Sequence, residues 1–513
     1  MLPISGHHPC LERTRSTPSK ATDSLLLDRK SSSFNSLNSP TFQQPYLSVL
    51  HPRALLFLSL LCLQVVLFVV ARSLLISLSF PRGRHHFPAP LTASVPAAAT
   101  ADNLTAASTD TAECSSGRVY VYELPKFFNR EIIEQCDNLN PWGSRCDALA
   151  NDGFGPPATG LDGLVPREVA PAWFWTDQFV LEIIFHNRML KHRCRTTDPE
   201  KARGFYIPFY AGLEVGKYLW TNSTDADRDR HCGMVLRWVQ EQEYFKRSYG
   251  WDHFISMARI TWDFRRTKDD DWGSSCIYLP GMRNITRLLI ERNPWDYFDV
   301  GVPYPTAFHP RSDSDVIAWQ DHVRTRHRNT LFCFAGATRR TINIDFRGLL
   351  LDQCREAGDS CRAVNCAGSR CLNGTSAILE TFLDSKFCLQ PRGDSFTRRS
   401  IFDCLVAGSI PVLFWKRTAY FQYEWFLPKE KESYSVYIDR NEVKNGTLIK
   451  EVLERFSDED VRRMREKVIE YIPKFVYAMK EEGLEGYKDA FDVAIDGVLR
   501  RFKEQEEWGF KWR

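Results

Sequence analysis

The sequence has almost no excess of charge of either sign. Its 67 lysines and arginines stand against 64 aspartates and glutamates, which leaves a formal net charge of +3. A nucleic-acid-binding protein needs a concentrated basic field on one face, so we expect no nucleic-acid partner. The chain has 513 residues, of which 43% are hydrophobic. That is long enough to bury a large core in two or three domains.

Cysteine spacings typical of a zinc site are also missing. Cys354, Cys361, Cys366 and Cys371 lie close together but do not form paired C-x-x-C motifs. We expect local disulfides here, closing a surface excursion between two structural elements. Thirteen of the 15 cysteines follow residue 71, and because that number is odd, at least one of them should lie outside the intrachain disulfides.

No acidic pair follows an apolar strand, which is where metal-dependent transferases place an Asp-x-Asp motif that binds manganese. Three acidic segments occur in polar surroundings, namely residues 225–227, 269–271 and 313–315. We interpret all three as solvated loops and expect no metal site.

Long apolar runs are scarce, but the sequence ALLFLSLLCLQVVLFVVA at residues 54–71 is long enough to cross a bilayer as a helix. About fifty polar residues precede it, so we interpret it as an uncleaved signal anchor rather than a signal peptide. Residues 1–53 would then be a disordered cytosolic tail. Residues 72–113, rich in Pro, Ala, Ser and Thr, would be a flexible stem.

The flanking arginines do not decide the orientation of this anchor, because more of them follow it than precede it. Potential N-glycosylation sites indicate the orientation more clearly, since they all lie after the anchor and are modified only in the secretory lumen. They are Asn103, Asn222, Asn284, Asn373 and Asn445. We therefore place the C-terminal bulk of the chain in the lumen.

The lumenal chain alternates between β-prone runs and helical patterns. Strands are predicted near residues 119–122, 204–210, 253–257, 330–336, 387–390 and 409–415. Helices are predicted within 175–194 and 399–407, after a capping pair of Ser457 and Asp460, and around Phe491, Ile495, Val498 and Phe502. This alternation predicts two facing α/β domains of the Rossmann type, at 114–328 and 329–513, with helices at the C-terminus.

Ligands bind at the carboxyl ends of strands in such folds, and two arginine-rich segments follow predicted strands. Small residues there let the backbone approach a diphosphate, and guanidinium groups can bind it in a forked geometry. Asp403, one turn farther along, has a carboxylate suited to ribose hydroxyls. The candidate donor-binding residues are Gly336, Arg339, Arg340, Arg392, Arg398, Arg399 and Asp403.

The segment CLQPRGDSFTRRSIFDCLVAGSIPVLF at 388–414 resembles the signature of exostosin-like glycosyltransferases, in particular the plant xyloglucan galactosyltransferase branch. The segments RVYVYELPKFFN at 118–129 and WDHFISMARITWDFRR at 251–266 agree with that resemblance. The sequence of residues 434–446, YSVYIDRNEVKNG, is most similar to that of enzymes that act on the second xylosyl side chain. One departure is PRG at 391–393, where related sequences often read PQG, so Arg392 is either an additional donor contact or simply exposed.

The resemblance implies a GT-B fold of two Rossmann-like domains in a single-pass type II Golgi membrane protein. It also implies inverting transfer of galactose from UDP-galactose to xyloglucan, with no cofactor and no obligatory metal. The general base should follow a strand of the first domain, and we favour Asp263 over Glu214. His253 precedes its strand, so we expect it to make a structural hydrogen bond instead.

Two alternatives remain open at this stage. Related plant proteins transfer arabinose, xylose or galacturonic acid, and a galacturonic acid donor would need an additional cation. Alternatively, the chain is a catalytically inert partner that assembles with other Golgi glycosyltransferases, although its full set of arginines and Asp403 speaks against that.

Overall fold

The computed structural model describes Gln64 and residues 114–507, apart from positions 269, 340–344, 369–370 and 372–373. The predicted tail, anchor and stem lie outside these residues, except for Gln64. Arg340, Asn103 and Asn373 lie outside them as well. Among the described residues, no helix combines the length and apolar character needed to span a bilayer.

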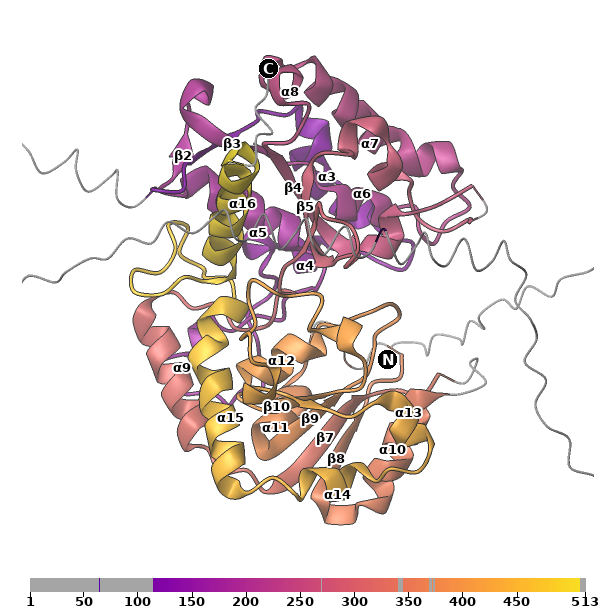
Figure 1. The fold of residues 1–513 in the computed structure, drawn as a ribbon, viewed down its shortest axis with the longest axis vertical. Coiled ribbons are helices and arrows are strands. Elements are labelled where there is room, and N and C mark those ends of the chain that lie inside the picture. Colours follow the sequence, from indigo (N-terminus) through magenta and orange to yellow (C-terminus); the bar gives the residue numbers. More distant parts are fainter. Residues whose placement is uncertain are drawn as a thin grey trace, which may run out of the picture. The chain divides into compact units, whose positions relative to one another are not determined.

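Residues 114–507 contain two β-sheets in which every strand pair is parallel, which confirms the predicted α/β class (Figure 1). The first sheet has the order β2-β1-β3-β4-β5-β6 and the second β11-β10-β9-β7-β8. The first-sheet strands are β1 (Arg118–Val121), β2 (Arg195–Thr196), β3 (Ala202–Ile207), β4 (His253–Ile260), β5 (Thr286–Glu291) and β6 (Asp299–Gly301). Those of the second are β7 (Thr330–Gly336), β8 (Cys361–Asn365), β9 (Ser385–Gln390), β10 (Ile410–Leu413) and β11 (Val436–Tyr437).

Helices lie in most of the connections between strands, as is usual for parallel pairing, whereas β5 and β6 are joined by residues 292–298 without a helix. Those associated with the first sheet are α3 (Arg130–Glu134), α4 (Cys146–Leu149), α5 (Leu181–Lys191), α6 (Ala211–Gly216), α7 (Asp225–Glu241) and α8 (Glu243–Ser248). The later ones are α9 (Asp313–Thr325), α10 (Phe346–Glu356), α11 (Ser376–Asp384), α12 (Ser400–Val406), α13 (Arg440–Lys444), α14 (Ile449–Leu453), α15 (Asp458–Tyr471) and α16 (Ala490–Glu507).

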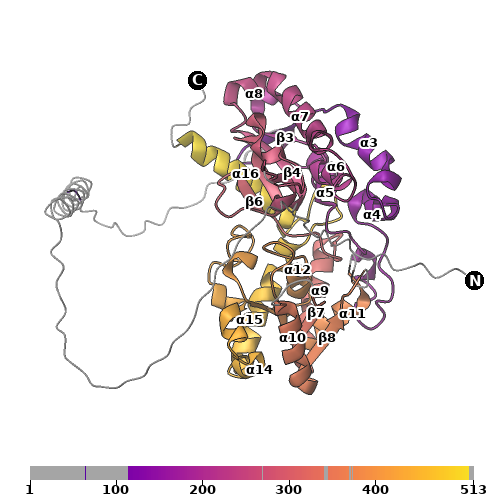
Figure 2. The ribbon, with the colours of Figure 1, turned by 90° about the vertical axis from the view of Figure 1, so that its right-hand side faces the viewer.

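The last helix, α16, returns to the first sheet. Phe502 lies so close to Gly204 of β3 that an added Cβ at Gly204 would stand 3.2 Å from its ring. Both ribbon views show α16 beside the strands of the first sheet (Figures 1 and 2). Helix α9 packs in turn against α15, where Gln320 donates to the carbonyl of Ile469 at 2.7 Å. The predicted division at residue 328 thus separates the strands of the two sheets. Two helices do not follow it, because α9 precedes residue 328 but packs against α15, and α16 follows it but packs against the first sheet.

Six disulfides join cysteines of the described chain, and Cys333, buried in β7, is free. The odd cysteine and the two local bridges, Cys354–Cys361 and Cys366–Cys371, confirm the predictions. The interpretation of this cluster as a mere surface excursion was wrong, because residues 361–365 form the edge strand β8. No residue of this strand is fully buried, so it carries no apolar run for a pattern to reveal.

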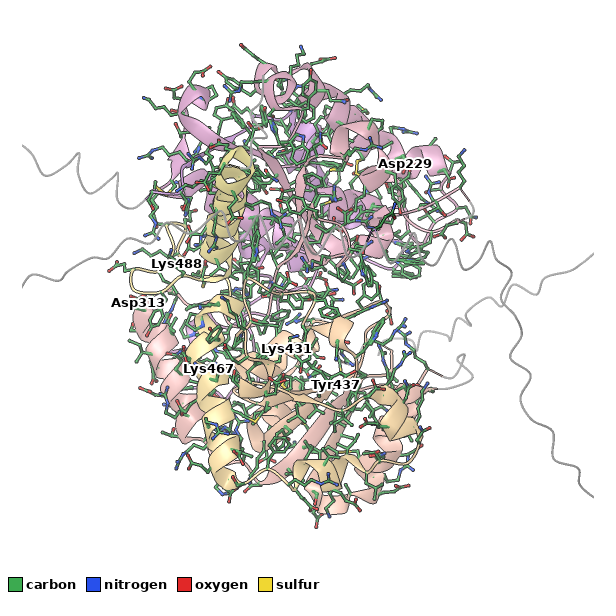
Figure 3. All side chains as sticks on the ribbon, in the orientation of Figure 1. Asp229, Asp313, Lys431, Tyr437, Lys467 and Lys488 are labelled. Atoms are coloured by element: carbon green, nitrogen blue, oxygen red, sulfur yellow. A yellow bond between two sulfur atoms is a disulfide. The ribbon has the colours of Figure 1, made fainter. Side chains whose placement is uncertain are left out.

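The interpretation of the acidic pairs as solvated loops was also wrong for the two pairs that the structure describes in full. Asp225 and Asp227 lie in the first turn of α7, and Asp227 forms a capping box with Thr224. Asp313 and Asp315 lie in the first turn of α9, where Asp313 accepts a hydrogen bond from the backbone of residue 486 at 2.7 Å (Figure 3). Carboxylates are favourable at the positive end of the helix dipole, which explains their placement.

Candidate functional site

A cavity of about 1060 Å³ lies where loops that follow strands of both sheets meet. From the first half come residues near Trp142, Gly212 and Asp263, and from the second half come Arg392, residues 394–396 and Trp415. Many of its lining side chains are aromatic, namely Trp142, Phe179, Trp220, Trp262, Trp272, Phe396 and Trp415. We refer to it as the aromatic cavity.

Asp263, the preferred candidate base, lines the aromatic cavity. It follows β4 in a short 3-10 helix, Thr261–Phe264, and its side chain is almost fully buried. Arg259 donates its Nε–H to Oδ2 at 2.9 Å, and Trp272 donates its Nε1–H to Oδ1 at 2.9 Å. Each carboxylate oxygen therefore has one fixed partner and a second lone pair for another donor.

Glu214, the second candidate, is not among the residues that line this cavity, although Leu213 and Gly216 of the same helix are. Its carboxylate pairs with the imidazole of His231 on α7. His253 lies at the start of β4 and hydrogen-bonds the hydroxyl of Tyr122 at 2.8 Å, which confirms the structural role expected for it.

A second cavity, of about 290 Å³, opens at the carboxyl edge of the second sheet. We call it the basic pocket because it is lined by the cations Arg339, Arg347, Arg392, Arg440 and Lys444. Its other lining residues include the aromatic rings of Phe346, Phe414 and Trp415, together with the acid Asp345. A pocket lined by both aromatic rings and several cations suits a ligand that has both a flat ring and negative charge.

The cations of the basic pocket repel one another. Burial, together with the nearby guanidinium groups of Arg398 and Arg339, lowers the pKa of Arg347 to about 9. The pKa of Arg339 is also lowered, by burial and by Arg392. Asp394 pairs with Arg339, but its own side chain is 84% exposed. A bound anion would relieve this repulsion, so the electrostatics of the pocket favour an anionic ligand.

Three of the predicted donor residues, Arg398, Arg399 and Asp403, do not line the basic pocket but a smaller cavity of about 180 Å³. Arg398 donates to the carbonyl of Ala335 at 2.9 Å, and burial lowers its pKa to about 10. Arg399 contacts Asp403 at 3.3 Å and donates to the carbonyl of Thr176. Within the described chain, one buried guanidinium nitrogen of Arg398 and one of Arg399 have no hydrogen-bond partner.

The structure thus divides the predicted donor set. Arg339 and Arg392 line the basic pocket, and Gly336 ends β7 without lining any of the three cavities. Sequence reasoning missed Arg347, Arg440 and Lys444. Arg347 lies in the first turn of α10, where a cation is unfavourable unless an anion is near, so its position at a helix N-terminus was the signal that could have found it.

Arg392 and Trp415 line both the aromatic cavity and the basic pocket. The guanidinium carbon of Arg392 lies 5.5 Å from the centre of the Trp415 ring. The two cavities are therefore neighbours that share these two lining residues, with the carboxylate of Asp263 in one and a group of cations in the other.

Glu291 is another residue that sequence reasoning missed. It ends β5, is fully buried, and accepts a hydrogen bond from the backbone N–H of Thr397 at 2.8 Å. The hydroxyl of Ser395 and the backbone N–H of Phe396 also favour its charged form, yet burial raises its pKa to about 7. This carboxylate holds the loop that carries Arg392 against the first sheet.

Among the described residues, the group whose ligand atoms lie at metal-binding separations is Cys136, Asp137 and Cys146. The two thiols of this group form a disulfide, which removes them as thiolate ligands.

Comparison of the sequence with those of known proteins shows which family the chain belongs to. Over its full length the chain is 62% identical to xyloglucan galactosyltransferase XLT2 of Arabidopsis thaliana, and the alignment covers 100% of both chains. It is 40% identical to xyloglucan galactosyltransferase MUR3 of the same plant, over 75% of this chain and 62% of that one. It is 38% identical to xyloglucan-specific galacturonosyltransferase 1, also from Arabidopsis thaliana, over 76% of this chain and 57% of that one. Residues 113–456 match the exostosin GT47 domain, and the chain belongs to this glycosyltransferase family.

Proposed function

We propose that this protein transfers galactose from UDP-galactose to xylosyl side chains of xyloglucan, with inversion and in a GT-B fold. The observation that carries the proposal is that the basic pocket and the aromatic cavity lie side by side and share two lining residues, Arg392 and Trp415. A nucleotide diphosphate fits the pocket with five cations, and an acceptor sugar fits the cavity that contains Asp263. The relative that is 62% identical is named a xyloglucan galactosyltransferase.

In this proposal the acceptor hydroxyl attacks the anomeric carbon of galactose from the side of the aromatic cavity. The bond from that carbon to the UDP oxygen breaks, the new glycosidic bond forms, and the hydroxyl proton passes to the Asp263 carboxylate. Arg339, Arg347, Arg392 and Arg440 stabilise the negative charge that develops on the departing diphosphate. The arginines supply this positive charge without a metal ion or cofactor.

The proposal also includes a type II orientation in the Golgi membrane, with residues 114–507 in the lumen. Six disulfides in the described chain support an oxidising compartment. Asn222 and Asn445, two of the potential glycosylation sites, are exposed as glycosylation requires.

UDP-galacturonic acid is a second candidate donor. Arg392 places a cation at the boundary of the two cavities, where it can reach the carboxylate of such a sugar. One relative, 38% identical, is named a galacturonosyltransferase.

A donor screen tests the proposal. The full-length protein is incubated with xylosylated glucan oligosaccharides and, separately, with UDP-galactose, UDP-galacturonic acid, UDP-xylose or UDP-arabinose. We expect a mass increase of one hexose with UDP-galactose alone. Transfer of another sugar would reassign the donor. Absence of transfer from all four would favour the role of a non-catalytic partner in a Golgi complex.

A further inference from the structure

Three tryptophans from separate loops form one wall of the aromatic cavity. The ring of Trp220 lies 5.2 Å from that of Trp142 and 4.7 Å from that of Trp272, measured between ring centres. Trp142 is 71% exposed and Trp220 52% exposed. Large apolar side chains that stay exposed as a contiguous group in a soluble region mark an interaction site.

The loop that carries Trp142 is fixed by a disulfide and by local hydrogen bonds. A disulfide between Cys136 and Cys146 closes the loop that carries Trp142. Within that loop the side-chain oxygen of Asn140 accepts hydrogen bonds from the backbone N–H groups of Trp142, at 2.8 Å, and Gly143, at 3.0 Å. These contacts fix the backbone on both sides of Trp142.

The charges on the first-sheet side of the cavity neutralise one another. Arg145 pairs with Asp177 at 3.1 Å, and Arg259 pairs with Asp263 at 2.9 Å. What remains beside the tryptophans is the amide and hydroxyl chemistry of the lining residues Asn140, Ser144 and Gln178. Ring faces for C–H groups, together with neutral hydrogen-bonding groups for hydroxyls, fit a neutral sugar chain better than an acidic one.

The size of the cavity agrees with a chain rather than a single sugar. Its volume of about 1060 Å³ slightly exceeds the roughly 300 to 1,000 Å³ of small-molecule sites. Trp272 also donates its Nε1–H to Asp263, so the wall is joined directly to the candidate base. A chain that lies on the wall is therefore held beside the carboxylate.

We propose that the wall of Trp142, Trp220 and Trp272 binds the neutral glucan backbone of the acceptor and positions one of its branches at Asp263. The inference rests on the proposed function, because it assigns the acceptor to the aromatic cavity and the nucleotide to the basic pocket. It adds a binding surface on the first half of the chain that is separate from the donor residues.

The test is the combined variant Trp142→Ala and Trp220→Ala in the full-length protein, with a xylosylated cello-oligosaccharide as the acceptor. We expect the acceptor KM, and the dissociation constant measured by calorimetry, to rise about tenfold, as loss of stacking on aromatic rings implies. The dissociation constant for UDP should not change. Trp220→Phe, which keeps a ring, should restore most of the affinity in a protein that retains Trp142.

Tyr249→Ala is the matched control, because Tyr249 is exposed but does not line the cavity. If the folded double variant keeps the acceptor KM while the wild type transfers galactose, the inference fails and the proposed function stands. If the wild type binds the oligosaccharide through these tryptophans but transfers no galactose, the proposed function fails and the binding wall stands. A double variant that loses UDP affinity to the same extent would assign the tryptophans to the donor and overturn the inference.

Discussion

The backbone N–H of Thr397 donates a hydrogen bond to the Glu291 carboxylate at 2.8 Å and thereby ties the arginine-rich loop of the second half to the first sheet. Tyr423 reinforces this junction, since its hydroxyl donates to the carbonyl of Ile290 at 2.8 Å and lies 3.2 Å from the hydroxyl of Thr397. The loop that contributes Arg392 to both cavities is thus positioned by a buried carboxylate of the other sheet.

Glu291 should make stability depend on pH. Burial raises the pKa of Glu291 to about 7, so the folded state holds the proton more tightly than the unfolded state does. The resulting stabilisation is fully present below the unfolded pKa and is lost as pH rises through about 7. Between pH 5 and pH 8, the unfolding free energy of the wild type should fall relative to Glu291→Gln by roughly 2 to 4 kcal/mol.

Chemical denaturation of both proteins across this range measures the difference. Exposed Glu451→Gln is the control for removing one carboxylate, and its curve should run parallel to that of the wild type. A constant difference between wild type and Glu291→Gln would show that Glu291 does not titrate in this window.

Arg440→Ala should weaken UDP binding. Arg440 lines the basic pocket, and the loss of one charge-assisted contact costs about 1.5 to 3 kcal/mol, or roughly 10- to 150-fold in Kd. Calorimetric titration with UDP measures this loss. Arg462→Ala removes the same charge from the outer face of α15, where the side chain is 70% exposed, and should leave the Kd unchanged. Equal affinities for the two variants would remove Arg440 from the donor site.

Asp263→Asn should abolish turnover while UDP binding persists. An amide oxygen still accepts the hydrogen bond from Trp272, but it cannot take up a proton from the acceptor hydroxyl. We expect kcat to fall by about 10²- to 10⁴-fold, which is the contribution of a general base. Steady-state kinetics and UDP calorimetry on the same preparation separate the two effects. A variant with near-normal kcat would show that the base lies elsewhere, and Glu214→Gln would then be examined in the same assay.

Removal of N-glycans should increase the mobility of the expressed protein on a gel. Asn222 and Asn445 are exposed within N-x-Thr sequences, and each occupied site adds a glycan if the domain is lumenal. Asn222→Gln and Asn445→Gln should each remove one step of the shift. Identical mobility before and after glycosidase treatment would contradict the lumenal orientation.

Much of the fold could be predicted because strands and helix caps are encoded by short stretches of neighbouring residues. The seven residues of β7 match the predicted strand, and the predicted pair of Ser457 and Asp460 forms the capping box of α15. The edge strand β8 could not be predicted, since its residues are only partly buried. The return of α16 to β3 depends on contacts between residues almost three hundred positions apart, which no local pattern encodes.

The candidate site could be predicted only in part for the same reason. A position after a strand sufficed to find Asp263, Arg339 and Arg392. Arg440 and Arg339 line the same pocket only because strands far apart in the sequence pair with one another. No local pattern could therefore predict that Arg440 lines it. Asp403 was predicted to bind ribose hydroxyls, and in the structure its carboxylate lies 3.3 Å from Nε of Arg399, four residues earlier on the same helix face.

The chemistry of the proposed transfer leads to one measurement that tests it most directly. The full-length protein is supplied with UDP-α-galactose and a xylosylated glucan oligosaccharide in the presence of EDTA, and the product is examined by proton NMR. A single displacement, with the departing diphosphate stabilised by arginines, predicts activity without a divalent ion and a galactose on a xylosyl residue with a β-anomeric proton signal. An α-linked product, or activity that returns only when manganese is added, would contradict this account.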